Sequence, residues 1–179
     1  GRRDAAPPST RFVQLASAEP VQGAAATSRL RSFVASNGTV DSHNTTFRAS
    51  GWVLERFNRN PVVPLFHNYR DFPVGKGRAY VAGDELRLDV EFAPADDPVS
   101  GPHAEQALLW VDRGVLGVSV GFDFRTAEYE YNKERETGDE IADWFFPPLD
   151  FVRQELHEVS IVTIPSNPDA LPVGRDALR

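Results

Sequence analysis

The clearest pattern in the chain is a strict alternation of apolar and charged residues over positions 85 to 92. The apolar members are Leu86, Leu88, Val90 and Phe92. A period of two places them on one face, so we expect a half-buried β-strand there. Positions 78 to 81 predict a partner strand, joined to the first through a turn at Gly83.

Shorter apolar runs predict further strands at 30–35, 62–66 and 156–162. Helical spacing of apolar residues occurs at 52–57 and 102–113, and Gly114 is suited to cap the second helix. Many short strands with two clear helices indicate a mostly β domain that is closed or strongly curved. The charged and aromatic stretch from 125 to 147 lacks a period, and we interpret it as an excursion from the sheet.

One more predicted strand, over positions 114 to 122, has two unlike faces. Four apolar residues fall on one side: Leu116, Val118, Val120 and Phe122. Gly117, Ser119 and Gly121 fall on the other side, which leaves one hydroxyl on a nearly bare face. An extended peptide could reach such a serine, so Ser119 is a candidate nucleophile. The alternative is a serine in a tight strand, with both glycines serving close packing.

A serine nucleophile needs a base to take its proton, and the chain has four histidines. His67 has the best context, because it follows an apolar run and precedes polar residues, as at the end of a strand near solvent. The ordinary alternative is a surface or capping histidine. His43 lies in a polar stretch and His103 begins a predicted helix, so we expect both to be structural.

A third group must orient the base and stabilise its charged form. Glu158 lies in a strand that is apolar on both faces, so its carboxylate is expected to pair with His67 or with a structural arginine. The two-residue period places Leu156 on the face of Glu158 and His157 on the opposite face. His157 is therefore an alternative orienting residue, and at most one of the two reaches His67. Weaker candidates are Glu155 and Asp150.

Composition narrows the class of protein. The 179 residues suit one domain, at about 29–171, between tails at 1–28 and 172–179. A net charge of −7 argues against a nucleic-acid surface, and no apolar run is long enough for a membrane span. The first residues lack the order of a secretory signal, so secretion is not expected. No cysteine is present and the histidines are isolated, so neither a metal site nor a cofactor is expected.

Three blocks occur in an order that resembles a known family. They are residues 52–68, with Asn60-Pro61-Val62 before His67; residues 113–122, with Ser119 before Gly121-Phe122; and residues 156–165, with Glu158-Val159-Ser160 before Pro165. Over about 30–171, the chain resembles the head-maturation (prohead) proteases of tailed bacteriophages, serine proteases related to the herpesvirus capsid protease assemblin. The Gly-x-Ser-x-Gly spelling at 117–121 also fits α/β-hydrolases, but no helix is predicted directly after it.

The resemblance implies a small β-barrel wrapped by helices, with Ser119 as nucleophile, His67 as general base and Glu158 as third member, where herpesvirus proteases use a second histidine. It also implies a serine endopeptidase that cleaves scaffold, major capsid protein and itself. The expected place of action is the host-cell cytoplasm, inside the immature capsid. Herpesvirus relatives act as dimers, so a homodimer is a further expectation. The charged insert at 127–148 departs from the family pattern by lengthening the gap before Glu158.

Two other functions fit the same sequence. One is a non-enzymatic capsid-assembly or scaffold-binding module, and the other is an esterase-like hydrolase. A catalytic pair would bring Ser119 Oγ within roughly 2.6–3.2 Å of a His67 ring nitrogen. Oxyanion donors could be backbone N–H groups near Val120 or Gly121, or an arginine.

Overall fold

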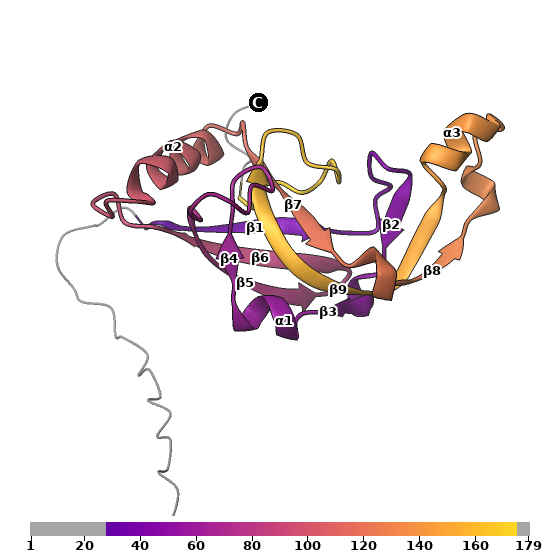
Figure 1. The fold of residues 1–179 in the computed structure, drawn as a ribbon, viewed down its shortest axis with the longest axis horizontal. Coiled ribbons are helices and arrows are strands. Elements are labelled where there is room, and N and C mark those ends of the chain that lie inside the picture. Colours follow the sequence, from indigo (N-terminus) through magenta and orange to yellow (C-terminus); the bar gives the residue numbers. More distant parts are fainter. Residues whose placement is uncertain (1–27, 175–179) are drawn as a thin grey trace, which may run out of the picture.

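The computed structural model describes residues 28–174, so all but the last position of the predicted tail at 1–28, and the last five positions of the chain, lie outside the described residues. This part of the chain is mostly β, with three α-helices and a strongly curled sheet (Figure 1). The strands are β1 Leu30–Ser36, β2 Thr45–Phe47, β3 Trp52–Val53, β4 Val62–Val63, β5 Gly75–Ala82, β6 Glu85–Phe92, β7 Gly117–Phe122, β8 Glu128–Tyr131 and β9 Leu149–Val162. The helices are α1 Glu55–Arg59, α2 Gly101–Asp112 and α3 Glu140–Phe145. The expected β-rich class is confirmed.

An antiparallel sheet in the order β1-β6-β5-β4 forms one wall. Strands β5 and β6 are the predicted hairpin, and Gly83 turns it with φ of 63°, a left-handed conformation that glycine adopts without steric cost. The apolar face of β6 is buried as its alternation predicts, with Leu86, Leu88 and Val90 fully enclosed.

Strand β9 organises the rest of the molecule. Strands β7 and β8 run antiparallel to it, whereas β2 and β3 run parallel to it. An isolated bridge, from Leu65 to Ile161, continues the parallel series and joins the segment after β4 to β9. Segments that are far apart in the sequence therefore lie along one strand (Figure 1). Non-local pairing of this kind is what brings residues from positions near 67, 119 and 158 together.

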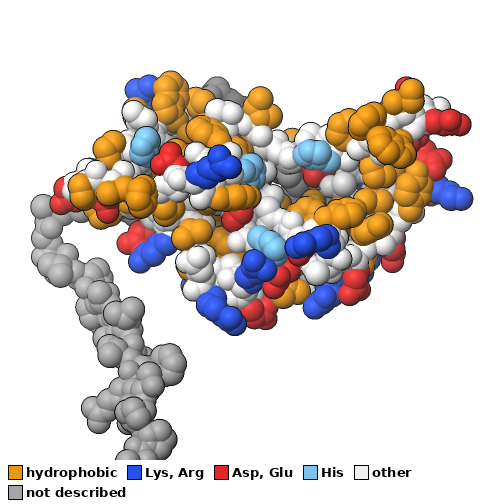
Figure 2. Space-filling model, viewed as in Figure 1, with side chains coloured by type: hydrophobic (Ala, Val, Ile, Leu, Met, Phe, Trp, Pro, Cys, Tyr) orange, Lys and Arg blue, Asp and Glu red, His pale blue; other side chains and the backbone are white. Residues whose placement is uncertain are grey.

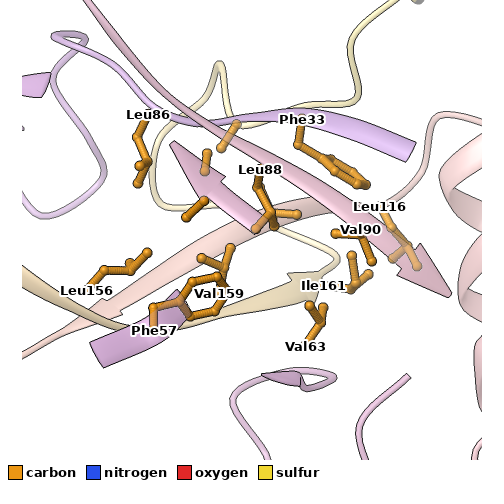
Figure 3. Close-up of a cluster of buried hydrophobic side chains, with 14 of the residues drawn as sticks. Phe33, Phe57, Val63, Leu86, Leu88, Val90, Leu116, Leu156, Val159 and Ile161 are labelled. Atoms are coloured by element: carbon orange, nitrogen blue, oxygen red, sulfur yellow. The ribbon is translucent and has the colours of Figure 1, made fainter. Parts of the chain in front are cut away.

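The core lies between this antiparallel sheet, as one wall, and β9 with its partner strands, as the other. Aliphatic and aromatic side chains from both walls pack against each other there (Figure 3). Its fully buried members include Phe33, Phe57, Val63, Leu156 and Ile161. Helix α2 closes one end through its small buried residues Ala104, Ala107 and Val111. Within residues 28–174, no helix is both long and apolar enough to span a membrane.

The chain after β9 returns to the sheet. Val118 N–H donates to Ala170 O at 3.0 Å, and Val34 N–H donates to Leu171 O at 3.1 Å. Val173 N–H donates to Ser32 O at 2.8 Å, and Pro172 bridges Phe33. Residues 170–173 therefore connect β7 with β1, although the sequence assigns the last two of them to a tail.

The structure corrects several sequence predictions, among them two boundaries and one face. Trp52–Val53 is a strand and not the start of a helix, because it pairs with positions 154 and 155 of β9. Strand β4 stops at Val63, since Pro64 has no N–H and Phe66 has a left-handed backbone with φ of 53°. Leu156 packs in the core with Val159 and not on the face of Glu158 (Figure 3). A bulge opposite Gly121/Phe122 adds one residue to β9 and shifts the period there.

Residues 123–148, the arm, connect β7 with β9. They contain α3 and also β8, which pairs antiparallel with β9, so the predicted excursion is wrong at positions 128–131, where the chain is part of the sheet. Asp139 caps α3 by accepting hydrogen bonds from the N–H groups of Ile141 and Ala142. The arm projects from one end of the molecule (Figure 1).

Candidate active site

The centre of the site is the buried carboxylate of Glu158 on β9, of which 6% is exposed. Its Oε1 lies 2.7 Å from His67 Nδ1, and its Oε2 accepts a hydrogen bond from Ser160 Oγ at 2.7 Å. The Tyr69 hydroxyl donates to Oε1 at 3.4 Å. A carboxylate that only accepts, from three donors, is satisfied in its ionised form. The expected pairing of Glu158 with His67 is confirmed, and the arginine alternative is wrong.

His67 is held in place by its backbone as well as by Glu158. Phe66 and His67 have φ of 53° and 56°, so two consecutive residues other than glycine are left-handed. Such conformations cost on the order of 1–3 kcal/mol each and persist only where surrounding contacts fix them. Phe66 N–H donates to Ile161 O at 3.0 Å, and His67 N–H donates to Ser160 Oγ at 3.2 Å. Strand β9 thus fixes both the ring and the main chain of His67.

Ser119 lies opposite Ser160 in the antiparallel pair of β7 and β9. Residues opposite each other share a face, with Cβ atoms roughly 5 Å apart, so Ser119 borders the group formed by Ser160, Glu158 and His67. Its side chain is largely enclosed, with 7% exposed. Among the hydrogen bonds of residues 28–174, none joins Ser119 to His67. The structure therefore brings the three predicted residues to one place without the expected serine–histidine hydrogen bond.

The space beside the two glycines that flank Ser119 is filled by other atoms of this chain and is not open. A Cβ at Gly121 would collide with Glu158 Oε1 and lie 3.1 Å from the carboxyl carbon. A Cβ at Gly117 would collide with Ala170 O and with the ring of Pro165. The expectation of a bare peptide-binding face is wrong at these two positions, and the close-packing alternative is correct there. Gly121 is what allows Glu158 to lie flat against β7 and reach His67.

The other candidates for the third role have different partners. His157 Nε2 lies 3.2 Å from Glu155 Oε2, so these two residues satisfy each other away from His67. Asp150 binds Arg135 at the base of the arm. His43 lies in a turn beside Asp41, and His103 lines a cavity described below. Within the described range, no cluster of three metal-ligating side chains occurs.

Two residues of the site were missed by the sequence reasoning. Ser160 is fully buried and connects Glu158 with the His67 main chain. The sequence could have indicated Ser160, because it lies two residues after Glu158 and a strand places both on the same face. Tyr69 gave no signal, because its approach to Glu158 depends on the left-handed turn before it. Burial, together with the charge and hydrogen bond of Glu158, raises the pKa of the Tyr69 hydroxyl, so it stays a donor at neutral pH.

Strand alternation narrows the choice of oxyanion donors. Val118 N–H points away from β9, because it donates to Ala170 O. Successive N–H groups of a strand alternate in direction, so Val120 N–H also points away from β9, whereas Gly121 N–H points into the β9 pairing. Of the two predicted backbone donors, only the Val120 N–H therefore lies outside the pairing of β7 with β9.

An apolar cavity of about 300 Å³ adjoins this site. It is lined by Leu65, Phe66, His103, Gln106, Ala107, Trp110, Val115, Leu116 and Thr163. A larger hollow of about 870 Å³ lies between residues 28–30, 73–76 and 91–94, and none of the site residues lines it. None of them lines the smaller cavity either, but its residues Leu65 and Phe66 directly precede His67 in the chain.

Comparison with models of known protein families, with curated proteins and with solved structures found no match. The resemblance to prohead proteases accordingly rests on the three sequence blocks. What the site does is argued below from its geometry.

Proposed function

We propose that the chain is a serine endopeptidase of the phage head-maturation type, on an assemblin-like barrel wrapped by helices. The observation that carries this proposal is the 2.7 Å contact between His67 Nδ1 and Glu158 Oε1, beside the strand that presents Ser119. An imidazole held by a buried carboxylate next to a serine is the arrangement that acyl transfer needs. The strained turn at His67 adds support, because such conformations cluster at functional sites.

In the proposed reaction, the Glu158 carboxylate accepts from His67 Nδ1–H and so leaves the lone pair on Nε2. Nε2 takes the proton of Ser119 Oγ as that oxygen attacks the peptide carbonyl carbon. The Val120 N–H is suited to stabilise the oxyanion. His67 then returns the proton to the departing amine, which leaves an acyl-enzyme. Water, deprotonated by the same nitrogen, releases the acyl group and restores Ser119.

Attack requires Ser119 to turn toward Nε2, because no hydrogen bond joins the two residues in this structure. Hydrogen bonds of catalytic groups commonly tighten only when substrate binds. We infer that the substrates are scaffold and major capsid protein, with self-cleavage in addition. The proposed place of action is the immature capsid in the host-cell cytoplasm, and a homodimer is part of the proposal. No cofactor or metal enters the mechanism.

A labelling experiment tests the nucleophile. The full chain is treated with a fluorophosphonate, which reacts with activated serines, and the adduct is located by mass spectrometry. We expect one adduct on Ser119, its loss in Ser119→Ala, and at least a tenfold slower reaction in His67→Ala. Ser50→Ala is the matched control, because Ser50 is exposed and distant in the chain from the site. Labelling elsewhere with Ser119 unmodified overturns the assignment.

A cleavage experiment separates a peptidase from an esterase. Wild type and Ser119→Ala are incubated with scaffold and capsid protein, and fragments are identified by mass spectrometry. We expect defined fragments from wild type only. Equal fragmentation by Ser119→Ala removes the proposal.

The alternative of a non-enzymatic scaffold-binding module is favoured by one observation, the exposed apolar side chains of the arm. Ile141, Trp144 and Phe145 are 71%, 76% and 64% exposed. Binding of scaffold by wild type, together with neither labelling nor cleavage, would select this alternative.

A further inference from the structure

We propose that Ser160 is a positioning residue for the proposed base, and that its hydroxyl fixes both the carboxylate of Glu158 and the main chain of His67. The consequence is that His67 carries its proton on Nδ1 and keeps the lone pair on Nε2, as proton transfer from Ser119 requires. This inference rests on the proposed endopeptidase function. It adds a residue that acts through His67 and does not touch the substrate.

Three hydrogen bonds connect Ser160, Glu158 and His67 in a closed ring. Ser160 Oγ–H donates to Glu158 Oε2 at 2.7 Å, and Glu158 Oε1 lies 2.7 Å from His67 Nδ1. The ring closes because the His67 main-chain N–H donates back to Ser160 Oγ at 3.2 Å. Each residue therefore holds the other two, and the loss of one member removes a contact from both of the others.

The two carboxylate oxygens of Glu158 have different donors. Oε1 is contacted by His67 Nδ1 and by the Tyr69 hydroxyl, whereas Ser160 is the one donor to Oε2 among the hydrogen bonds of residues 28–174. A hydroxyl has a single O–H, so Ser160 donates to Glu158 and nowhere else. Rotation of the carboxylate would break this bond where 6% of Glu158 is exposed, so little water could replace it. Ser160 therefore keeps Oε1 directed at Nδ1.

Ser160 also fixes the turn that carries His67. Phe66 and His67 are both left-handed, and Phe66 N–H donates to the main-chain oxygen of Ile161 at 3.0 Å. That bond joins two main-chain groups, so it does not depend on the side chain at either position. The bond from His67 N–H ends on the side chain of Ser160, so it depends on which residue stands at position 160. Backbone conformations of this kind persist only where neighbouring contacts hold them.

The burial of Ser160 indicates that its hydroxyl serves these contacts and not the substrate. Ser160 is fully buried, and its neighbours in β9, Val159 and Ile161, belong to the core. A buried hydroxyl is unfavourable unless it is hydrogen-bonded, and Ser160 both donates and accepts. Ser36 offers a contrast, because it is 1% exposed and its Oγ has no hydrogen-bond partner in the part of the chain that the structure describes. Loss of the Ser160 hydroxyl should therefore slow the chemistry and leave substrate binding unchanged.

The first test is Ser160→Ala in the full chain, with a peptide copied from a fragment boundary of the scaffold digest. We expect kcat to fall about 10- to 100-fold, because a misplacement of about 1 Å can cost on the order of a hundredfold in rate. KM should stay within about twofold, because a residue that does not touch the substrate leaves its binding intact. Ser36→Ala is the matched control and should keep both constants. An unchanged kcat in Ser160→Ala, or a loss confined to KM, overturns the inference.

A pair of variants separates the hydroxyl from packing. Thr and Val have nearly the same shape, but only Thr keeps an O–H donor. We expect kcat of Ser160→Thr to exceed that of Ser160→Val about tenfold. Both carry the same additional methyl group, so strain from the added volume cancels in the comparison. Equal kcat values for the two variants contradict the positioning role.

A double substitution tests whether Ser160 acts through His67. In the wild-type background, Ser160→Ala should slow the fluorophosphonate labelling of Ser119 about tenfold. In the His67→Ala background no base remains to be positioned, so the same change should alter the rate by less than about twofold. Equal factors in the two backgrounds would mean that Ser160 acts independently of His67, and the inference would be wrong.

Nitrogen NMR of the His67 ring separates positioning from catalysis, because it needs neither substrate nor turnover. Nitrogen chemical shifts distinguish which ring nitrogen carries the proton, and His67→Ala identifies the signals. At a pH where the ring is neutral, we expect wild type and Ser36→Ala to hold the proton on Nδ1, and Ser160→Ala to give a mixture of both tautomers. Identical tautomers in wild type and Ser160→Ala overturn the inference, whether or not the chain cleaves peptides. A tautomer difference without cleavage by wild type supports the role of Ser160 and removes the endopeptidase proposal alone.

Discussion

The site and the arm are two regions with opposite relations to solvent. At the site, Ser119, Glu158 and Ser160 are all at most 7% exposed, although all three are polar. In the arm, large apolar residues such as Ile141 and Trp144 are more than 70% exposed. The usual distribution is inverted in both regions, as Figure 2 shows for the hydrophobic side chains gathered over the arm.

The two regions differ in how strongly they depend on contacts with the rest of the fold. Buried polar groups are costly unless they are hydrogen-bonded, and the carboxylate of Glu158 accepts from three donors. The site is therefore rigid and sensitive to small changes. The arm keeps apolar surface in water at α3, whereas its strand β8 pairs with β9 and its Arg135 binds Asp150. Four substitutions test this contrast, and the largest effect is expected at the site.

Glu158→Gln is expected to lower kcat by about 10²–10⁴-fold, because an amide no longer holds Nδ1–H with a full negative charge. The folded state should remain, since Gln keeps the volume of Glu. Peptide-cleavage kinetics and circular dichroism measure the two effects. Glu155→Gln is the matched control, because Glu155 faces His157 and should leave kcat unchanged. Equal kinetics of the two variants would show that Glu158 has no role in the reaction.

Gly121→Ala is expected to reduce kcat/KM about 10- to 100-fold and to destabilise the fold by about 1–3 kcal/mol, the usual range for an overpacked site. Its Cβ would occupy the place of Glu158 Oε1 and push the carboxylate away from His67. Gly38→Ala is the control, because a Cβ there meets no atom within 4 Å. Denaturant unfolding and kinetics should separate the two variants. Identical behaviour would mean that β7 shifts without cost.

The contact between the arm and the sheet at Asp150 can be tested by the dependence of folding stability on pH. Burial alone would raise the pKa of Asp150, but hydrogen bonds from Thr46, Arg135 and Asn132 outweigh it and lower the pKa. A depressed folded-state pKa means that the stabilisation is complete above the unfolded value, near 3.8, and is lost as pH falls through the folded value.

We therefore expect Asp150→Asn to cost about 1–2 kcal/mol at pH 7, with solvent exposure of the pair keeping the figure low. The difference from wild type should shrink below pH 4. Thermal unfolding at a series of pH values measures it. A difference that is constant from pH 7 to pH 3 contradicts the assigned role.

Trp144→Ser is expected to have the smallest effect, within about 0.5 kcal/mol in the free energy of unfolding. The indole is 76% exposed and contacts Phe145 at the tip of the arm, so its loss leaves no cavity. Phe151→Ala, by contrast, removes a 2% exposed ring stacked on Phe47 and should cost about 3–5 kcal/mol. A large loss for Trp144→Ser would mean that α3 packs on the domain.

The sequence by itself determined the elements whose local pattern agrees with their environment. The alternation in β6 predicted its buried face, and the spacing in α2 predicted that helix to within one residue at each end. A two-residue period also put Ser119 and Glu158 in strands, and the cost of a buried carboxylate predicted that Glu158 pairs with His67 or with an arginine. These inferences succeed because they depend only on period and on desolvation.

The tertiary structure decided whatever depends on contacts between distant segments. The left-handed turn at Phe66 and His67 exists because β9 supplies the groups that fix it, and no local residue type predicts it. The bulge in β9 changed the face of Leu156, because one extra residue inverts a two-residue period. Only the fold shows that the carboxylate of Glu158 occupies the position where a Cβ of residue 121 would lie. A glycine in the sequence indicates that a side chain would not fit at that position. The residue that occupies the space beside it comes from another strand, and only the fold identifies that residue.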